Sequence, residues 1–254
     1  MVMKLLALDT ATDACSAAVW VEGAVLERCE RAPRRHAALI LPMIETVLAE
    51  AGLEVTQLDA IAFGRGPGAF TGVRIAVGIV QGIAFAADLP GVPVSTLAAL
   101  ALGAARETGH ARIAVALDAR MGEVYWGTYA VAGETVRLLG DERVCAPTSV
   151  TAPPGEWFGV GSGWLAYSAA LSRRAAVGGW LGERYPRAGD VARLATDPAR
   201  RGDWIPAEQA LPVYLRNEIV SKPAATFLES GRSNGIAGDI AEGVICDNLM
   251  RRKR

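Results

Sequence analysis

A glycine-rich loop at residues 64–75 is the stretch of this chain best suited to hold an anion. It reads GRGPGAFTGVRI and joins an apolar strand-like run to a long apolar helix-like run. Glycines let a backbone turn tightly or approach another backbone closely, and the amides at a helix N-terminus can bind an anion. The loop has no lysine in a G-x-x-x-x-G-K-[ST] frame, and its glycines do not follow G-x-G-x-x-G. The pattern is therefore compatible with an anion site and with a tight structural turn.

Two aspartates, Asp9 and Asp118, each end a short apolar strand-like run. A carboxylate in that position can accept hydrogen bonds from the amides of the turn that follows it. Thr10 and Thr12 can contact a phosphate or cap the same turn. These are the best candidates for chemistry in the chain, and a structural role is the alternative for each of them.

Other reactive side chains lack the spacing that catalysis or metal binding needs. Ser162 has no G-x-S-x-G frame and no histidine after it. His36 and His110 lie far apart, with no second histidine four residues away, so we interpret them as surface or helix-end residues. We predict no catalytic residue, metal ligand or cofactor. Three arginines lie nearest the motif loops, and we interpret them as ion-pairing or partner-contact residues: Arg65, Arg74 and Arg120.

Composition argues against a basic nucleic-acid binder and against a secreted or membrane protein. The formal net charge of the 254 residues is -1, so no strong field attracts RNA. The four cysteines are scattered without C-x-x-C, which is typical of reduced thiols. No leader pattern is visible at the N-terminus, and the uncharged run at 75–87 is shorter than the roughly 20 residues that span a bilayer. We expect a cytoplasmic protein.

The elements that must position these residues occur in a repeated order. Hydrophobic periodicity predicts strands at 5–8, 17–21 and 24–28, a helix that ends at Gly52, a strand at 60–63, a helix at 73–87, a strand at 92–94 and a helix at 95–106. This βββαβαβα order begins again at 113–119, where Leu117-Asp118 matches Leu8-Asp9, and continues with strands at 124–129 and 136–144. The repeat predicts an internal duplication.

The second copy is reduced, because after residue 145 only short helical pieces at 164–174 and 190–195 are recognisable. We predict an α/β protein with a first lobe at 1–108, a second, reduced lobe at 109–222 and a flexible tail at 223–254.

A duplicated unit with an acidic residue after each first strand resembles the two-lobed actin/Hsp70/sugar-kinase superfamily. Within it, the chain resembles the bacterial TsaB (YeaZ) family over roughly residues 3–222. Four segments carry the resemblance: LDTAT at 8–12, GRGPGAFTGVR at 64–74, DARMGEVY at 118–125 and PVYLR at 212–216.

The resemblance implies a role in making threonylcarbamoyladenosine (t6A) beside the anticodon of tRNA. It implies that the chain is the non-catalytic partner of the paralogue TsaD, with a small TsaE-type ATPase docking on the pair and tRNA reached only through the complex. The His-x-x-x-His metal pair of the catalytic paralogue has no counterpart here. Superfamily members use strand-end aspartates near Mg²⁺ and phosphate, so Asp9, Thr10 and Asp118 are the candidate cofactor-binding residues, with the structural alternative still open.

The helix at 73–87 supplies residue-level support for a partner. From residue 75 to residue 87 it has apolar or small residues on every face, interrupted only by Gln81, so a neighbour must cover the side that its own sheet leaves free. Gly78, Gly82 and Ala86 form a small-residue column at i, i+4 and i+8 that would let a second helix approach. Leu41, off the main apolar stripe of the first helix, is the expected neighbouring contact. The alternative is a helix buried entirely in its own lobe.

Rival functions from other classes are an ATP-dependent small-molecule kinase or ATPase of the same superfamily, and a metalloprotease. Nucleotide binding and turnover by the isolated chain would favour the first, and the missing His-x-x-x-His pair counts against the second. The isolated chain could also pair with itself.

Overall fold

The computed structural model describes residues 2–216, and the statements that follow concern that part of the chain. The tail predicted at 223–254 lies outside the described residues.

The first half has the predicted βββαβαβα order. Its elements are β1 (Lys4–Asp9), β2 (Ala14–Val21), β3 (Ala24–Arg31), α1 (His36–Ala51), β4 (Ala60–Gly64), α2 (Phe70–Ala87), β5 (Gly91–Val94) and α3 (Thr96–Thr108). The strands form one sheet in the order β3-β2-β1-β4-β5, with β1 antiparallel to β2 and parallel to β4. Gly52 ends α1 with a φ of 62°, the left-handed conformation that makes glycine a common residue after a helix.

The second half repeats the same topology. Its elements are β6 (Arg112–Arg120), β7 (Glu123–Ala132), β8 (Thr135–Leu138), β9 (Arg143–Cys145), β10 (Trp157–Val160), α4 (Ser162–Leu171), β11 (Val177–Leu181) and α5 (Ala188–Arg201). The order β8-β7-β6-β10-β11 matches the first sheet strand for strand, which confirms the predicted duplicated α/β fold. The copy is reduced where α1 would stand, because only a single 3₁₀ turn at Pro147–Ser149 occupies that place.

Two details of the second half differ from the prediction. The strand predicted at 136–144 is two strands, β8 and β9, which both pair with β7. Strands β10 and β11 were not predicted. They are four and five residues long and contain glycines, so their hydrophobic pattern is too short to stand out.

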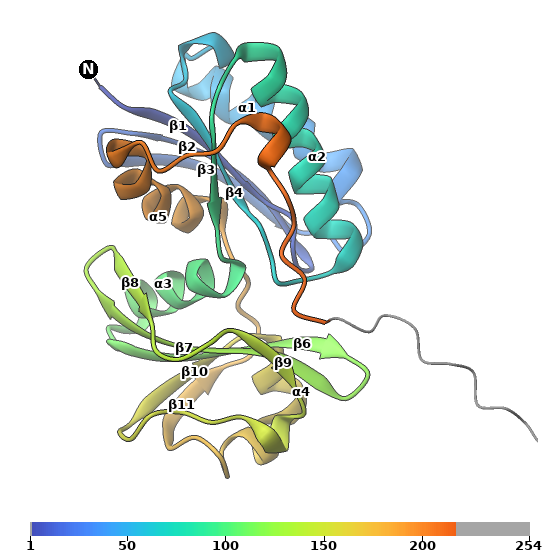
Figure 1. The fold of residues 1–254 in the computed structure, drawn as a ribbon, viewed down its shortest axis with the longest axis vertical. Coiled ribbons are helices and arrows are strands. Elements are labelled where there is room, and N and C mark those ends of the chain that lie inside the picture. The colour runs from blue at the N-terminus through green and yellow to red at the C-terminus, as the bar shows by residue number, and fades with distance from the viewer. Residues whose placement is uncertain (1, 217–254) are drawn as a thin grey trace, which may run out of the picture. The chain divides into compact units, whose positions relative to one another are not determined.

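Each sheet is covered on both faces, and the last helix of each half crosses to the other sheet (Figure 1). Helices α1 and α2 cover one face of the first sheet, and α5 covers its other face. Helix α3 packs mainly on one face of the second sheet, with α4 on the opposite face. The lobe boundaries at 108 and 222 stay predictions, but each sheet depends on a helix from the other half of the chain.

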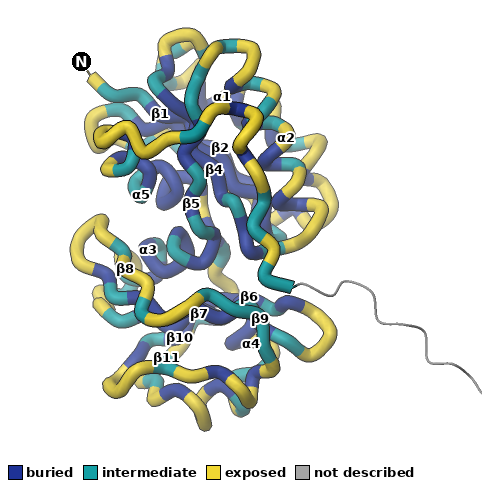
Figure 2. Tube along the Cα trace, viewed as in Figure 1, coloured by how far each residue is buried: buried dark blue, intermediate teal, exposed yellow. Residues whose placement is uncertain are grey.

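Helix α2 begins at Phe70, three residues before the predicted start. By length and composition it could cross a membrane, a weak criterion that core helices of soluble proteins also meet. Its inner residues, such as Val73, Ala76 and Val80, are buried on the first sheet. Its outer residues are exposed, as the yellow segments along α2 indicate (Figure 2).

Candidate functional site

The glycine-rich loop packs backbone against backbone on the turn between β1 and β2. A Cβ atom on Gly72 would lie 2.1 Å from the carbonyl oxygen of Thr10, and one on Gly68 would lie 2.3 Å from that of Ala11. The Thr10 hydroxyl donates to the Gly72 carbonyl (2.7 Å), and the Ala69 amide donates to the Ala11 carbonyl (2.7 Å). Glycine is needed because any side chain would push the two segments apart. This contact supports the structural interpretation of the loop over the anion site.

Asp9 is fully buried at the end of β1. Its Oδ1 accepts a hydrogen bond from the Ala11 amide (2.9 Å), and Oδ2 has no partner among the described residues. Oδ2 lies against Gly64, where a Cβ would come within 1.8 Å of it. Burial raises the pKa of Asp9 from 3.8 to about 7, and the Ala11 hydrogen bond opposes that rise. The carboxyl thus packs inside the first lobe and holds the turn that the glycine loop contacts.

Asp118, at the end of β6, also binds its own turn. Oδ1 accepts from the Arg120 amide (2.9 Å), and Oδ2 forms an ion pair with the Arg120 guanidinium (3.0 Å). The Asp118 amide donates to the hydroxyl of Ser162 (3.1 Å). The two strand-end aspartates therefore have the matching turn-holding roles expected of a duplicated motif, and Ser162 supports one of these turns.

A cleft of about 450 Å³ lies beside both turns. An actin-like fold implies a Mg²⁺ nucleotide here, so the carboxylates must be tested against a hard cation that binds oxygen ligands. The lining includes Asp118 but not Asp9 or Thr10, and both Asp118 oxygens contact Arg120. The residues present therefore do not fit a Mg²⁺ nucleotide, and we derive no step through one.

The two histidines are separate and not paired with each other. His36 is the buried first residue of α1, and His110 is exposed and stacks on Phe158 with ring centroids 4.4 Å apart. Within residues 2–216, no three His, Cys, Asp or Glu side chains lie close enough to hold a metal ion.

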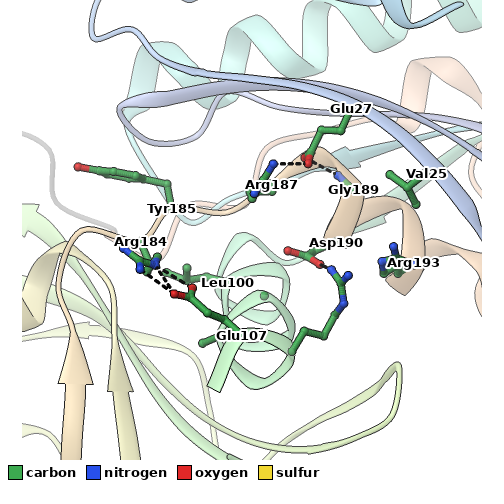
Figure 3. A pocket seen from close by; sticks show the side chains of 13 residues that line it. Val25, Glu27, Leu100, Glu107, Arg184, Tyr185, Arg187, Gly189, Asp190 and Arg193 are labelled. Carbon is green, nitrogen blue, oxygen red and sulfur yellow. Dashed lines mark hydrogen bonds and ion pairs between the residues drawn. The ribbon is translucent and has the colours of Figure 1, made fainter. Parts of the chain in front are cut away.

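A second pocket, of about 640 Å³, lies between β3, α3 and the start of α5 (Figure 3). Ion pairs cross its walls: Arg106 to Asp190 (2.6 Å), Arg187 to Glu27 (2.7 Å) and Arg184 to Glu107 (2.6 Å). Burial raises the pKa of Asp190, and its contact with Arg106 opposes that rise. The first pair joins α3 to α5, the second joins β3 to the residue before α5, and the third joins α3 to the segment between β11 and α5. Sequence reasoning missed them because the partners are far apart in the chain.

The segment after α5 runs back over the glycine loop to the second half (Figure 1). We call residues 204–216 the strap. The amide of Val213 donates to the Arg65 carbonyl (2.8 Å), and Gln81 on α2 donates to the Ala210 carbonyl (2.9 Å). Arg216 pairs with Glu123 and donates to the Ala119 carbonyl (3.2 Å). The strap thus fixes α2 and the turn after β6 to each other.

The predicted small-residue column lies on the outer surface of α2. Gly78, Gly82 and Ala86 are exposed, and Cβ atoms built on the two glycines meet nothing within 4 Å. Phe85 beside them is 84% exposed, and Leu41 on α1 is 48% exposed. The alternative of a helix buried wholly in its own lobe is therefore wrong. Contact of this surface with a partner stays a prediction.

Comparison with known proteins identifies the family. The family model described as "TsaD: tRNA N6-adenosine threonylcarbamoyltransferase" matches residues 29–159, about half of the chain. The tRNA threonylcarbamoyladenosine biosynthesis protein TsaB of Escherichia coli is 42% identical over 228 residues, covering 87% of this chain and 97% of the relative. TsaB of Haemophilus influenzae is 40% identical, with 87% and 96% covered.

A solved structure agrees with these relatives. YeaZ from Pseudomonas aeruginosa is 50% identical, and it superposes with a TM-score of 0.80 over 84% of this chain and all of its own. High identity, near-complete coverage of the relatives and a shared fold point to one assignment. The chain belongs to the TsaB (YeaZ) family.

Proposed function

We propose that this chain is a non-catalytic scaffold subunit for synthesis of the t6A modification of tRNA. In this role it binds and activates the catalytic paralogue TsaD in the cytoplasm, a TsaE-type ATPase docks on the pair, and tRNA is bound through the complex. The names of the Escherichia coli and Haemophilus influenzae relatives support the pathway. The exposed column of Gly78, Gly82 and Ala86 is the observation that supports a docking role.

The column suits a helix as the docking element. Each glycine in a helix interior lowers the stability of the helix by about 1 kcal/mol relative to alanine. An exposed pair of glycines therefore does not help the chain to fold, and docking of a partner would explain their presence. Small residues at i and i+4 leave a shallow groove that another helix can enter. Phe85, three residues after Gly82, supplies exposed apolar area beside that groove, and Leu41 is an exposed apolar residue of α1.

The experiment that tests this function reconstitutes the modification. Purified TsaD, a TsaE-type ATPase, the enzyme that supplies threonylcarbamoyl-adenylate and unmodified tRNA are combined with and without this chain. We expect t6A to form only when the chain is present, and a stable complex with TsaD in size-exclusion chromatography. Equal t6A yields with and without the chain would refute the scaffold role.

Gly82→Leu is predicted to weaken the complex with TsaD while leaving the isolated chain folded. A branched side chain would occupy the groove, and overpacking of about 1–3 kcal/mol corresponds to a roughly 5- to 150-fold weaker Kd. The open space at Gly82 and the better helix propensity of leucine predict an unchanged or higher Tm. Calorimetric titration and thermal unfolding measure the two effects.

Ala169→Leu is the matched control for this prediction. Ala169 is an exposed residue of α4, on the second sheet, so the same type of change should leave the affinity for TsaD unaltered. Equal affinities of Gly82→Leu and the wild type would place the docking surface elsewhere.

The isolated chain is predicted to hydrolyse no ATP and to carry no stoichiometric metal. The physical basis is that Asp9 is buried outside the lining of the cleft and that Asp118 pairs with Arg120. Coupled-enzyme ATPase assays and elemental analysis check the prediction. Steady turnover by the chain alone would favour the kinase or ATPase alternative.

A further inference from the structure

The exposed surface of α2 continues beyond the small-residue column toward the start of the helix. Phe70 and Arg74 precede Gly78, Gly82 and Ala86 at the same four-residue spacing, and all five residues are exposed. Residues four apart lie on one face of a helix, so the five form one continuous row. The row is aromatic and cationic at its N-terminal end, open at its two glycines and apolar at its C-terminal end.

Arg74 is held in place by aromatic rings. Its guanidinium carbon lies 3.3 Å from the ring centroid of Phe70 and 5.0 Å from that of Tyr214. The two rings lie 5.8 Å apart, and Tyr214 belongs to the strap. A guanidinium stacked on a ring keeps its N–H groups free at its edge, so these rings orient the donors without using them.

No carboxylate in residues 2–216 pairs with Arg74. The ion pairs of this part of the chain involve Arg28, Arg31, Arg35, Arg106, Arg120, Arg184, Arg187, Arg193, Arg200, Arg201 and Arg216. Arg74 differs from these arginines, because it is oriented by rings while its charge has no counter-ion among the described residues.

We infer that Arg74 gives the row its charge specificity, because it binds a carboxylate on the partner. This inference rests on the proposed function and specifies the partner: a helix with small or apolar residues opposite Gly78 and Gly82 and an acidic residue at the end that meets Arg74. A planar guanidinium and a carboxylate match as a two-point hydrogen-bonded pair, which fixes the register of the docked helix.

A protein carboxylate fits the row better than an RNA phosphate backbone. The row holds one cation, and it continues into two glycines and apolar residues that offer nothing to successive phosphates. The neighbouring helix α1 carries exposed Glu45, which would repel a polyanion, and its exposed Glu50 pairs with Arg28. The net charge of -1 likewise gives no overall positive field to attract RNA non-specifically.

The test measures the Kd for TsaD with three variants at position 74. Arg74→Gln keeps a polar side chain and removes the charge, and we expect affinity to fall by roughly 5- to 50-fold. Arg74→Glu should bind more weakly than Arg74→Gln, because it places two carboxylates together. Arg74→Lys should lie between wild type and Arg74→Gln, because it keeps the charge without the planar fork. Each variant should keep the wild-type Tm within about 4 °C, because the loss of an exposed cation–π contact costs only about 0.5–1 kcal/mol.

The control is Arg173→Gln, an exposed arginine that follows α4 on the second sheet, and we expect wild-type affinity from it. The salt dependence of the Kd should be smaller for Arg74→Gln than for wild type, since one charge pair has been removed. Wild-type affinity of Arg74→Gln would overturn the inference. So would a loss of direct tRNA binding by the chain at unchanged TsaD affinity, which would assign Arg74 to RNA.

Failure of the inference can be told apart from failure of the proposed function. If Gly82→Leu weakens the complex and Arg74→Gln does not, the row docks TsaD without the predicted carboxylate. If the wild-type chain does not bind TsaD, the scaffold role itself is wrong.

Discussion

Gly72→Ala is expected to lower the free energy of unfolding by about 3 kcal/mol or more, the upper range for overpacking. The new Cβ would lie 2.1 Å from the Thr10 carbonyl oxygen, and this neighbour is backbone, which cannot rotate away as a side chain can. The start of α2 would have to move off the turn between β1 and β2. That movement would also stretch the hydrogen bond from the Thr10 hydroxyl to the Gly72 carbonyl. Urea unfolding followed by circular dichroism measures the loss.

Gly78→Ala on the same helix is the control for this prediction. A Cβ at Gly78 meets nothing within 4 Å, so the higher helix propensity of alanine should raise stability by up to about 1 kcal/mol. The same substitution, glycine to alanine, is thus expected to lower stability at one glycine of this helix and to raise it at another. Equal urea midpoints for Gly72→Ala and the wild type would show that the loop does not press on the turn.

Asp9→Asn is expected to flatten the dependence of stability on pH between about pH 4 and pH 7. The pKa of Asp9 is raised by burial to about 7 in the folded chain, against 3.8 for the free group. Over that window the folded state keeps a proton that the unfolded state has lost. The free energy of unfolding of the wild type therefore falls as pH rises, by about 1.4 kcal/mol per pH unit from this residue alone. The full stabilisation is present below pH 4 and is lost above pH 7.

Asparagine cannot ionise, and its oxygen can still accept from the Ala11 amide, so the variant should be more stable than wild type at pH 8. The difference should approach an upper limit of about 4 kcal/mol, which is the free-energy equivalent of the gap between the folded and unfolded pKa of Asp9, and should shrink toward pH 4. Asp118→Asn is the control, because this partly exposed carboxylate already pairs with Arg120. Stability curves for Asp9→Asn and wild type that run parallel from pH 4 to pH 8 would contradict the prediction.

The first half of the fold could be predicted from sequence because its signals are local. Gly52 ends α1 where the apolar pattern stops, and the glycine-rich loop separates β4 from α2. The second half was predicted less well for a physical reason. Strands β10 and β11 are short and draw their stability from pairing with β6 and with each other, which no local pattern reports.

The candidate site also has features that could be predicted from the sequence and features that could not. The column at Gly78, Gly82 and Ala86 could be found from spacing, because helical periodicity places these residues on one face. The stacking of Arg74 with Phe70 and Tyr214 could not, because Tyr214 reaches α2 only through the strap. The strap and the crossing of α3 and α5 bring distant residues together, and both depend on tertiary packing and not on a local sequence pattern.

The crossing of α3 and α5 has a consequence for how the chain is completed on the ribosome. The last strand of the first sheet ends at Val94, whereas α5, which covers one face of that sheet, begins only at Ala188. At about 5–20 residues per second, the intervening stretch of roughly 90 residues takes on the order of 5–20 s to make. During that interval Leu5, Ala18 and Ala60 face water or a chaperone. The N-terminal lobe therefore cannot finish folding as it emerges, and its second face closes only when α5 has been synthesised.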